Sequence, residues 1–174
     1  VIHREKNGKL WYFSYPLKDT EDFLIVATTR PETMLGDTAV AVNPKDNRYK
    51  KFIGKTVILP LVGREIPVIA DDFVDPDFGT GCVKVTPAHD PNDFSIGERH
   101  DLEFINIMNK DASMNSQVPK KYQDLSRESA RKAVLMDMDS DKKLHKVEDY
   151  IHNVGYSERG NVPIEFYLSE QWYL

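Results

Sequence analysis

Apolar residues in the first 110 positions fall into short runs separated by turn-forming residues. Residues 10–17 and 22–29 are rich in aromatic and β-branched side chains and flank the polar segment KDTE, which predicts an antiparallel hairpin. Many short strands with few, late helices indicate a strand-rich α+β domain or small barrel rather than an alternating parallel sheet. Further strands are predicted over residues 38–42, 55–62, 64–70, 82–86 and 103–109.

Two short helices are predicted between these strands, each from a capping residue that is followed directly by proline. One covers residues 43–54 with Asn43 as its cap, and the other covers residues 90–100 with Asp90 as its cap. A short polar side chain accepts hydrogen bonds from the free N–H groups of a first helical turn, and proline has no N–H to leave unpaired there.

The pattern changes beyond Asp111, where a loop-like stretch precedes a longer helical signal. A cap at Asp124 or Ser126 and apolar residues that recur at helical spacing predict a helix over residues 126–138. A second short helix is predicted over residues 139–149.

Length and composition fit one globular domain. The chain has 174 residues, 40% of them hydrophobic and 29% charged, with a formal net charge of −5. A protein that binds nucleic acid over its whole surface would be basic overall. With this net charge, only a local patch of lysine and arginine could bind RNA. No apolar run approaches the roughly 18 residues that span a bilayer, so no membrane contact is expected. The single cysteine, Cys82, excludes an internal disulfide, reads as a core residue and favours a cytoplasmic location.

A first polar cluster lies between two apolar strands. Its threonines could direct hydroxyl and backbone N–H groups at a ligand carbonyl or ribose, and Arg30 could meet a phosphate with two hydrogen bonds. The alternative is an ordinary capped turn in which Thr33 bonds its own backbone. The residues alone leave both open. The cluster consists of Thr28, Thr29, Arg30, Glu32, Thr33 and Asp37.

A second polar cluster ends the strand predicted over residues 82–86. Three interpretations are open: an active-site wall, a metal site, or a solvated turn with a helix cap. On a strand, Lys84 and Thr86 share one face. A metal hydrolase could use His89, Asp90, Asp93 and His100 as ligands. However, the adjacent His89 and Asp90 would point apart on a strand, and no further histidine cluster supports a closed site. The cluster contains Lys84, Thr86, His89, Asp90 and Asp93.

The two stretches ATTRPETMLGDTAVAVNP (27–44) and FGTGCVKVTPAHDPNDF (78–94) together resemble the inserted editing domain of the class I aminoacyl-tRNA synthetases for valine, isoleucine and leucine. Two long motifs in the right order are a strong signal. Glu32, Lys84 and Thr86 favour the valine branch over the isoleucine and leucine branches, which remain the alternatives. The resemblance covers essentially the whole chain, which lacks the HIGH and KMSKS signatures of the synthetic site.

The resemblance implies a single editing domain over residues 1–174, excised from a longer synthetase. It implies a small β-barrel-like core with short peripheral helices, a helical appendage over 124–150, and a strand segment over 155–174 that leads back to the catalytic core. The implied activity is hydrolysis of Thr-tRNA(Val), without cofactor or metal and without aminoacylation. The implied partners are the aminoacylated 3′ end of tRNA(Val) and the rest of the synthetase. A tRNA-docking module that is inactive in isolation is the alternative.

An editing site must hold threonine and leave valine alone, although the two are nearly isosteric. By resemblance, Asp93 would bind the α-ammonium of the ester through a charge-assisted bond. Thr86 and Asp90 would line the side-chain pocket. Lys84 beside them would donate to the threonine hydroxyl or hold Asp90 in place.

The remaining residues would hold the ester and the tRNA end. Thr29 and Thr33 would polarise the carbonyl or order the attacking water, which can suffice because the ester is already activated. Arg30 would hold a phosphate or ribose, and Phe78 would stack near the terminal adenosine unless it is a core residue beside a turn. The implied catalytic residues are Asp93, Thr29, Thr33 and Lys84, and the implied substrate-binding residues are Thr86, Asp90, Arg30, Phe78, Thr28 and His89. Lys50, Lys51, Arg127, Arg131 and Lys132 are either tRNA contacts or solvated residues.

Overall fold

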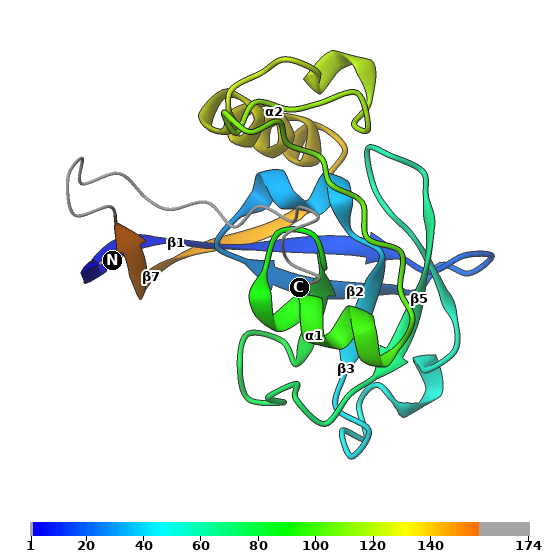
Figure 1. Ribbon diagram of the computed structural model, residues 1–174. Coiled ribbons are helices and arrows are strands. Elements are labelled where there is room, and N and C mark those ends of the chain that lie inside the picture. Colours follow the sequence, from blue (N-terminus) through cyan, green and yellow to red (C-terminus); the bar gives the residue numbers. More distant parts are fainter. Residues whose placement is uncertain (1, 157–174) are drawn as a thin grey trace.

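The computed structural model describes the backbone of residues 2–156 and the side chains of residues 8–151. Within this range the strands form two sheets (Figure 1). The three-stranded sheet has the order β2-β1-β7, with β1 (Ile2–Pro16), β2 (Phe23–Thr28) and β7 (Leu144–Tyr156). The four-stranded sheet has the order β4-β5-β3-β6, with β3 (Ala39–Val42), β4 (Thr56–Ile58), β5 (Glu65–Ala70) and β6 (Cys82–Val85).

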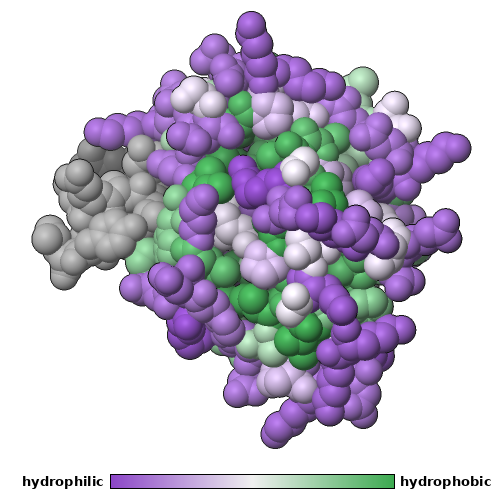
Figure 2. Space-filling view, turned by 90° about the vertical axis from the view of Figure 1, so that its right-hand side faces the viewer, coloured by the Kyte–Doolittle hydropathy of each residue, from purple (hydrophilic) through white to green (hydrophobic). Residues whose placement is uncertain are grey.

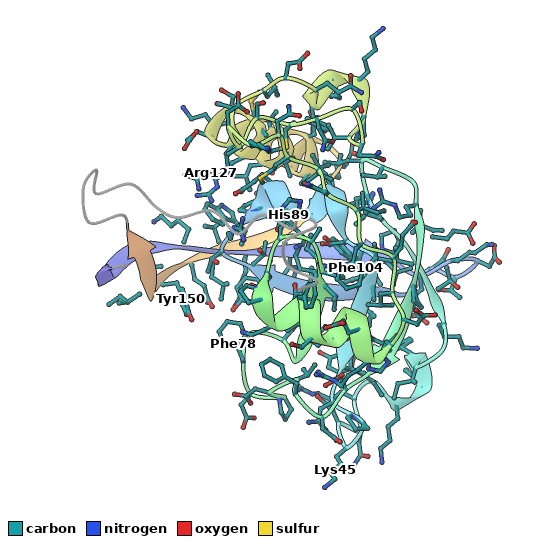
Figure 3. The ribbon with its side chains drawn as sticks, viewed as in Figure 1. Lys45, Phe78, His89, Phe104, Arg127 and Tyr150 are labelled. Atoms are coloured by element: carbon teal, nitrogen blue, oxygen red, sulfur yellow. The ribbon has the colours of Figure 1, made fainter. Side chains whose placement is uncertain are left out.

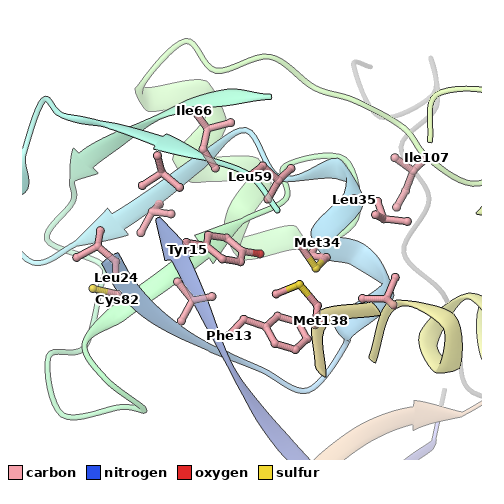
Figure 4. Packing of buried hydrophobic residues seen from close by; sticks show 14 of the residues in the cluster. Phe13, Tyr15, Leu24, Met34, Leu35, Leu59, Ile66, Cys82, Ile107 and Met138 are labelled. Carbon is pink, nitrogen blue, oxygen red and sulfur yellow. The ribbon is translucent and has the colours of Figure 1, made fainter. Parts of the chain in front are cut away.

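The hairpin of β1 and β2 is antiparallel, as the sequence predicts. Side chains alternate between the two faces of β1, so Phe13 and Tyr15 are fully buried on the core side. In the core, Tyr15, Met34 and Met138 point toward one another from three different elements (Figure 4). This convergence packs the turn that follows β2, which carries Met34, against the main core.

Strand β3 is the central strand of the second sheet, parallel to β5 and antiparallel to β6. All of its residues are buried, because both of its faces are covered. Val40 pairs with Lys84 across the antiparallel ladder, which fixes where the Lys84 side chain enters the interior.

Both sheets contribute residues to the main core, among them Val26 of β2 and Val40 of β3. β2 lies against β6, and an isolated bridge between Leu17 and Val57 connects the end of β1 to β4. No ladder joins β2 to β6 among the described residues, so the two sheets stay open instead of closing into one barrel. The expected strand-rich α+β class is therefore confirmed.

Short helices flank the sheets. Helix α1 (Pro91–Arg99) begins at Asp90 and α2 (Arg127–Ser140) begins at Ser126, and both caps accept backbone hydrogen bonds. These two helices confirm the predictions over 90–100 and 126–138. Short 3-10 helices occur at η1 (Pro31–Gly36), η2 (Lys50–Phe52) and η3 (Lys120–Tyr122). None of the helices in the described range is both long and apolar enough to cross a bilayer.

The helix predicted over residues 43–54 is wrong, because this segment forms turns that end in the short η2. The Asn43 side chain accepts a bond from the Lys45 N–H and donates to the Val74 carbonyl. A side chain used in this way stabilises a local turn and not the first turn of a helix.

The second helix predicted over residues 139–149 is also wrong, since residues from Leu144 onward form β7 and pair with β1. The expected helical appendage over 124–150 is thus helical mainly over α2. Long-range pairing overrides the local helical signal, as is common for strands. From residue 157 the expected terminal strand segment lies outside the described residues.

The strand predicted over residues 103–109 is wrong as well. Only Met108 forms a bridge there, with Met114. This segment is held instead by individual hydrogen bonds, such as that from the Ile107 N–H to the His89 ring.

On the face shown in Figure 2, hydrophobic residues form a broken central band framed by hydrophilic side chains.

Candidate active site

A cavity of about 190 Å³ opens where the ends of β2 and β6 meet the start of α1. All of the catalytic and substrate-binding residues that the resemblance implies line this cavity. Two stretches far apart in the sequence therefore form one pocket. These lining residues are Thr28, Thr29, Arg30, Thr33, Phe78, Lys84, Thr86, His89, Asp90 and Asp93.

The first stretch turns sharply after β2. Thr28 Oγ1 accepts a hydrogen bond from the Arg30 N–H at 3.0 Å, and Thr33 Oγ1 donates to the Arg30 carbonyl at 2.9 Å. These two hydrogen bonds agree with the capped-turn interpretation of the first polar cluster. They coexist with a pocket role, because the Arg30 side chain also reaches across to the second stretch. Its Nη1 donates to the His89 carbonyl at 2.7 Å.

The second stretch turns from β6 into α1. Asp90 Oδ1 accepts from the N–H groups of Asn92 and Asp93, at 2.8 and 3.1 Å. Asp93 lies one turn further on, and its Oδ2 accepts from the Thr86 N–H at 2.9 Å. Asp90 thus caps α1 and also lines the pocket.

His89 is fully buried, and its Nε2 accepts from the Ile107 N–H at 3.0 Å. The ring thereby anchors the backbone of the segment around Ile107. His89 thus holds a loop in place as well as lining the pocket.

The floor of the pocket is a buried ammonium group. Lys84 Nζ lies 2.8 Å from Asp37 Oδ1, 2.9 Å from Thr33 Oγ1 and 2.5 Å from Thr86 Oγ1. An ammonium has three N–H donors, and these contacts use all of them. The expectation that Lys84 holds Asp90 is therefore wrong, because its carboxylate partner is Asp37.

Asp37 belongs to the first polar cluster, but the sequence alone assigns it no role in the site. It is fully buried, and its carboxylate accepts from Tyr15 Oη and Thr86 Oγ1, each at 2.6 Å. Burial raises the pKa of Asp37, and the bonds from Lys84, Thr86 and Tyr15 oppose that rise. The sequence held one sign of this role, because an aspartate between two apolar strands is expected to need a buried partner. The partners themselves, Tyr15 and Lys84, lie far from it in the sequence.

The carboxyl group of Asp93 is poised between its two protonation states. Burial, together with the negative charge of Asp90, raises its pKa to about 7, while Lys84 and the Thr86 N–H act in the opposite direction. A cation that entered the pocket would favour the ionised form of Asp93. Such perturbed acids in a cleft are typical of functional sites.

An aromatic side chain lies at the mouth of the pocket. Phe78 is 39% exposed and packs edge-to-face against Tyr150, with ring centroids 6.1 Å apart (Figure 3). The interpretation of Phe78 as a core residue is therefore wrong. An exposed ring beside a cavity can stack with a nucleobase.

The alternative chemistries find no support in the geometry. His100 binds Asp71 at 2.9 Å at the far end of α1, away from Asp90 and Asp93. No group of three or more potential metal ligands occurs in the part of the chain that the structure describes. Cys82 is buried in the core, where desolvation raises its pKa to about 12, so its thiol is unsuited to be a nucleophile.

Comparison with known families shows the family of this chain. A family model described as "Leucyl-tRNA synthetase, editing domain" matches residues 45–154, which is more than half of the chain. The chain belongs to the synthetase editing-domain family. The expected family is confirmed by this match.

Proteins named valine–tRNA ligase resemble this editing domain over its whole length. The identity is 57% for the ligase of Synechocystis, 56% for that of Thermotoga maritima and 53% for that of Staphylococcus aureus strain MRSA252. The editing domain aligns over 100% of its length but covers only 19% or 20% of these relatives. It thus spans about a fifth of the length of the curated relatives it matches.

Two solved structures share the fold. The leucyl enzyme of Agrobacterium radiobacter K84, in a ternary complex with tRNA and LeuAMS, matches with a TM-score of 0.62 and 18% identity, over 86% of the editing domain and 20% of that chain. A structure described as GlLeuRS-CP1 matches with a TM-score of 0.58 and 14% identity, over 82% of the editing domain and 98% of that chain. At these identities the likeness concerns the fold.

An ion pair with a buried carboxylate connects the α2 helix of the editing domain to the turn beside the pocket. Arg131 binds the fully buried Glu32 with two nitrogens, at 2.9 and 3.2 Å, and also lies over the Trp11 ring. Glu32 is in η1, between the pocket residues Arg30 and Thr33. Arg131, considered above as a tRNA contact, therefore fixes the turn on which these residues stand.

Proposed function

We propose that this editing domain hydrolyses the ester of threonine mischarged onto tRNA(Val). The observation that carries the proposal is one small cavity in which acids that favour a cation stand beside a buried polar floor. The whole-length similarity to valine–tRNA ligases supports tRNA(Val) as the substrate. A cytoplasmic site of action fits the single, buried thiol of Cys82.

The two acids at the start of α1 suit the α-ammonium group of an aminoacyl ester. Asp93 has its pKa raised to about 7, so binding of an ammonium would drive its ionisation and form a charge-assisted bond. Asp90 adds a second negative charge nearby. The ester would thus be oriented by its amino group.

The floor of the pocket suits a hydroxyl and not a methyl group. Because the Lys84 ammonium is already bonded to Asp37, Thr33 and Thr86, the threonine hydroxyl would meet mainly acceptor oxygens, among them those of Thr86 and Asp93. A valine methyl group would offer these oxygens no further hydrogen-bond donor and would displace water from them, at a cost of about 1–3 kcal/mol for a buried polar group. This difference supports selection of threonine.

The mouth of the pocket suits the 3′ end of tRNA. Phe78 would stack with the terminal adenine, and Arg30 would lie near its ribose or phosphate. Thr29 lines the pocket and is partly exposed, so its hydroxyl would order the attacking water. Thr33 has its hydroxyl bonded to Arg30 and Lys84 and would keep the turn in place. No protein nucleophile is needed, because the ester is already activated.

The proposal is tested by following deacylation of Thr-tRNA(Val) and Val-tRNA(Val) by this chain, with and without EDTA. We expect release of threonine well above the buffer rate, little release of valine, and no effect of EDTA. Equal hydrolysis of both esters would contradict selection by the polar floor. No release of threonine at high protein concentration, with Thr-tRNA(Val) still bound, would instead identify a docking module. Faster release from a mischarged tRNA(Ile) or tRNA(Leu) would move the domain to another branch of the family.

A further inference from the structure

Asp37 is a buried charge that lies behind the pocket and not in its lining. It follows η1, and its backbone carbonyl accepts from Arg64 Nη1 at 2.8 Å. Its side chain meets groups from two strands, Tyr15 of β1 and Lys84 of β6, and also Thr86 just after β6. The residue thus connects the hairpin, the turn and the pocket strand at one point.

The contacts form a closed circuit. Asp37 Oδ1 accepts from both Lys84 and Thr86, and Lys84 also donates to the Thr86 hydroxyl. Tyr15 Oη holds the other carboxylate oxygen at 2.6 Å. Each polar group in the circuit therefore fixes the orientation of the next.

Without a buried partner, Lys84 would not remain in this position. An ammonium is strongly hydrated and stays buried only when it is paired, and a flexible lysine otherwise extends its head to solvent. Asp37 is the fully buried carboxylate that pairs with Lys84 here. The position of the Lys84 and Thr86 groups in the floor thus depends on a residue that the substrate does not reach.

We infer that Asp37 is the positioning residue that sets threonine selection, by holding Lys84 and Thr86 in the pocket floor through the Asp37–Tyr15–Lys84–Thr86 circuit. This inference rests on the proposed function, because selection is measured on aminoacyl-tRNA. The holding of Lys84 by Asp37 is a property of the free chain and can be tested separately.

The free chain is tested by NMR of lysine ammonium groups in a sample labelled with ¹⁵N at the side chains. A lysine ammonium that is buried and hydrogen-bonded exchanges slowly with water and gives a signal, so we expect one such signal from Lys84, assigned by its loss in Lys84→Met. Asp37→Asn should remove that signal. Asp71→Asn is the matched control, because Asp71 is also buried and ion-paired but lies away from the pocket, and it should leave the signal unchanged. A Lys84 signal that persists in Asp37→Asn would overturn the inference, whether or not the chain hydrolyses any ester.

Selection is then tested by kcat/KM for Thr-tRNA(Val) and Val-tRNA(Val). Asp37→Asn should lower the ratio of the two roughly 10- to 100-fold, the range for loss of a hydrogen bond to a charged group. Tyr15→Phe, which removes one bond and keeps the charge pair, should lower it severalfold and serves if Asp37→Asn fails to fold. Asp71→Asn should leave it unchanged.

The mechanism is tested by repeating Asp37→Asn in a Lys84→Met background. A residue that acts through Lys84 has little further effect once Lys84 is absent, whereas a merely structural residue has an additive effect. Full additivity, or a ratio unchanged in both Asp37→Asn and Tyr15→Phe, would overturn the inference. Absence of threonine release from the unsubstituted chain would contradict the proposed function and leave the NMR result to decide whether Asp37 holds Lys84.

Discussion

The two ends of α1 handle charge in opposite ways. At its start, Asp90 and Asp93 carry like charges toward the pocket, and burial with this repulsion raises the pKa of Asp93 to about 7. At its end, Arg99 and His100 both bind Asp71. Burial acts to raise the pKa of Asp71 as well, but hydrogen bonds from Arg99, the Phe73 N–H and His100 outweigh it, and the pKa is lowered.

The helix dipole does not explain this difference. Acids at a helix N-terminus and cations at its C-terminus are both favourable, so α1 supports the charges at each end. The neighbours decide: Asp71 meets two basic side chains of the described chain, whereas Asp93 faces a like charge and a cavity. The end of α1 stabilises the fold, and its start holds unfavourable charge that a cationic ligand would relieve.

The largest expected effect separates the two ends by activity. Asp93→Asn removes the charge that would bind the substrate ammonium, and we expect threonine release to fall roughly 100- to 1,000-fold, as for loss of a preorganised electrostatic contact. Asp93→Ala should abolish release while the fold stays intact. Asp71→Asn should change it less than about threefold, since it touches only structural groups. Single-turnover deacylation measures both, and an active Asp93→Asn variant would remove Asp93 from the role proposed for it.

The next effect separates the two ends by stability. Asp71→Asn should lower the free energy of unfolding by about 1–3 kcal/mol at neutral pH, less than for a fully buried pair because Arg99 is half exposed. The folded-state pKa of Asp71 lies below its unfolded value of about 3.9, so its contribution is present above that pH and lost as pH falls through the folded pKa. Urea unfolding should show the two chains converging below about pH 4. A difference that stays constant into strong acid would contradict this account.

Asp93 should show the opposite pH dependence, with a smaller amplitude. Its folded-state pKa of about 7 lies above the unfolded value, so the folded chain binds this proton more tightly and stability falls as pH rises between roughly 4 and 7. Asp93→Asn, which cannot ionise, should therefore stabilise the chain by about 1–2 kcal/mol above pH 7, discounted because the side chain is partly exposed. The gain should vanish near pH 4. Destabilisation of Asp93→Asn at pH 8 would show that its bond to Thr86 outweighs the repulsion from Asp90.

Local signals in the sequence predict α1 and its cap well. The pair Asp90-Pro91 is sufficient to predict the start of α1, because the Asp90 side chain accepts from N–H groups only two and three residues further along the chain. The two motifs likewise predict which residues line the pocket. Thr28, Lys84 and Asp93, which the two motifs predict to belong to one site, line the same cavity in the structure.

Long-range partners could not be predicted in this way. Lys84 appeared free to hold Asp90, its neighbour in the sequence, but the sheet register directs it to Asp37 instead. The segment after α2 has a local helical pattern but forms β7. It does so because it pairs with β1, for example Val147 with Trp11, and these residues lie far apart in the sequence. What the sequence reading missed is in both cases a pairing between elements.

The smallest expected effect tests whether the two ends of α1 are independent. His100 Nε2 binds Asp71 at 2.9 Å, but Arg99 binds the same carboxylate through two nitrogens and the His100 side chain is 27% exposed. His100→Gln should therefore cost only about 0.5–1 kcal/mol of unfolding free energy, the net value of one hydrogen bond. In an Asp71→Asn background this cost should shrink, because the shared partner has lost its charge. Threonine release should be unchanged in His100→Gln, and a several-fold change would mean that α1 transmits the state of its end to Asp93, so that the stabilising end also tunes the pocket.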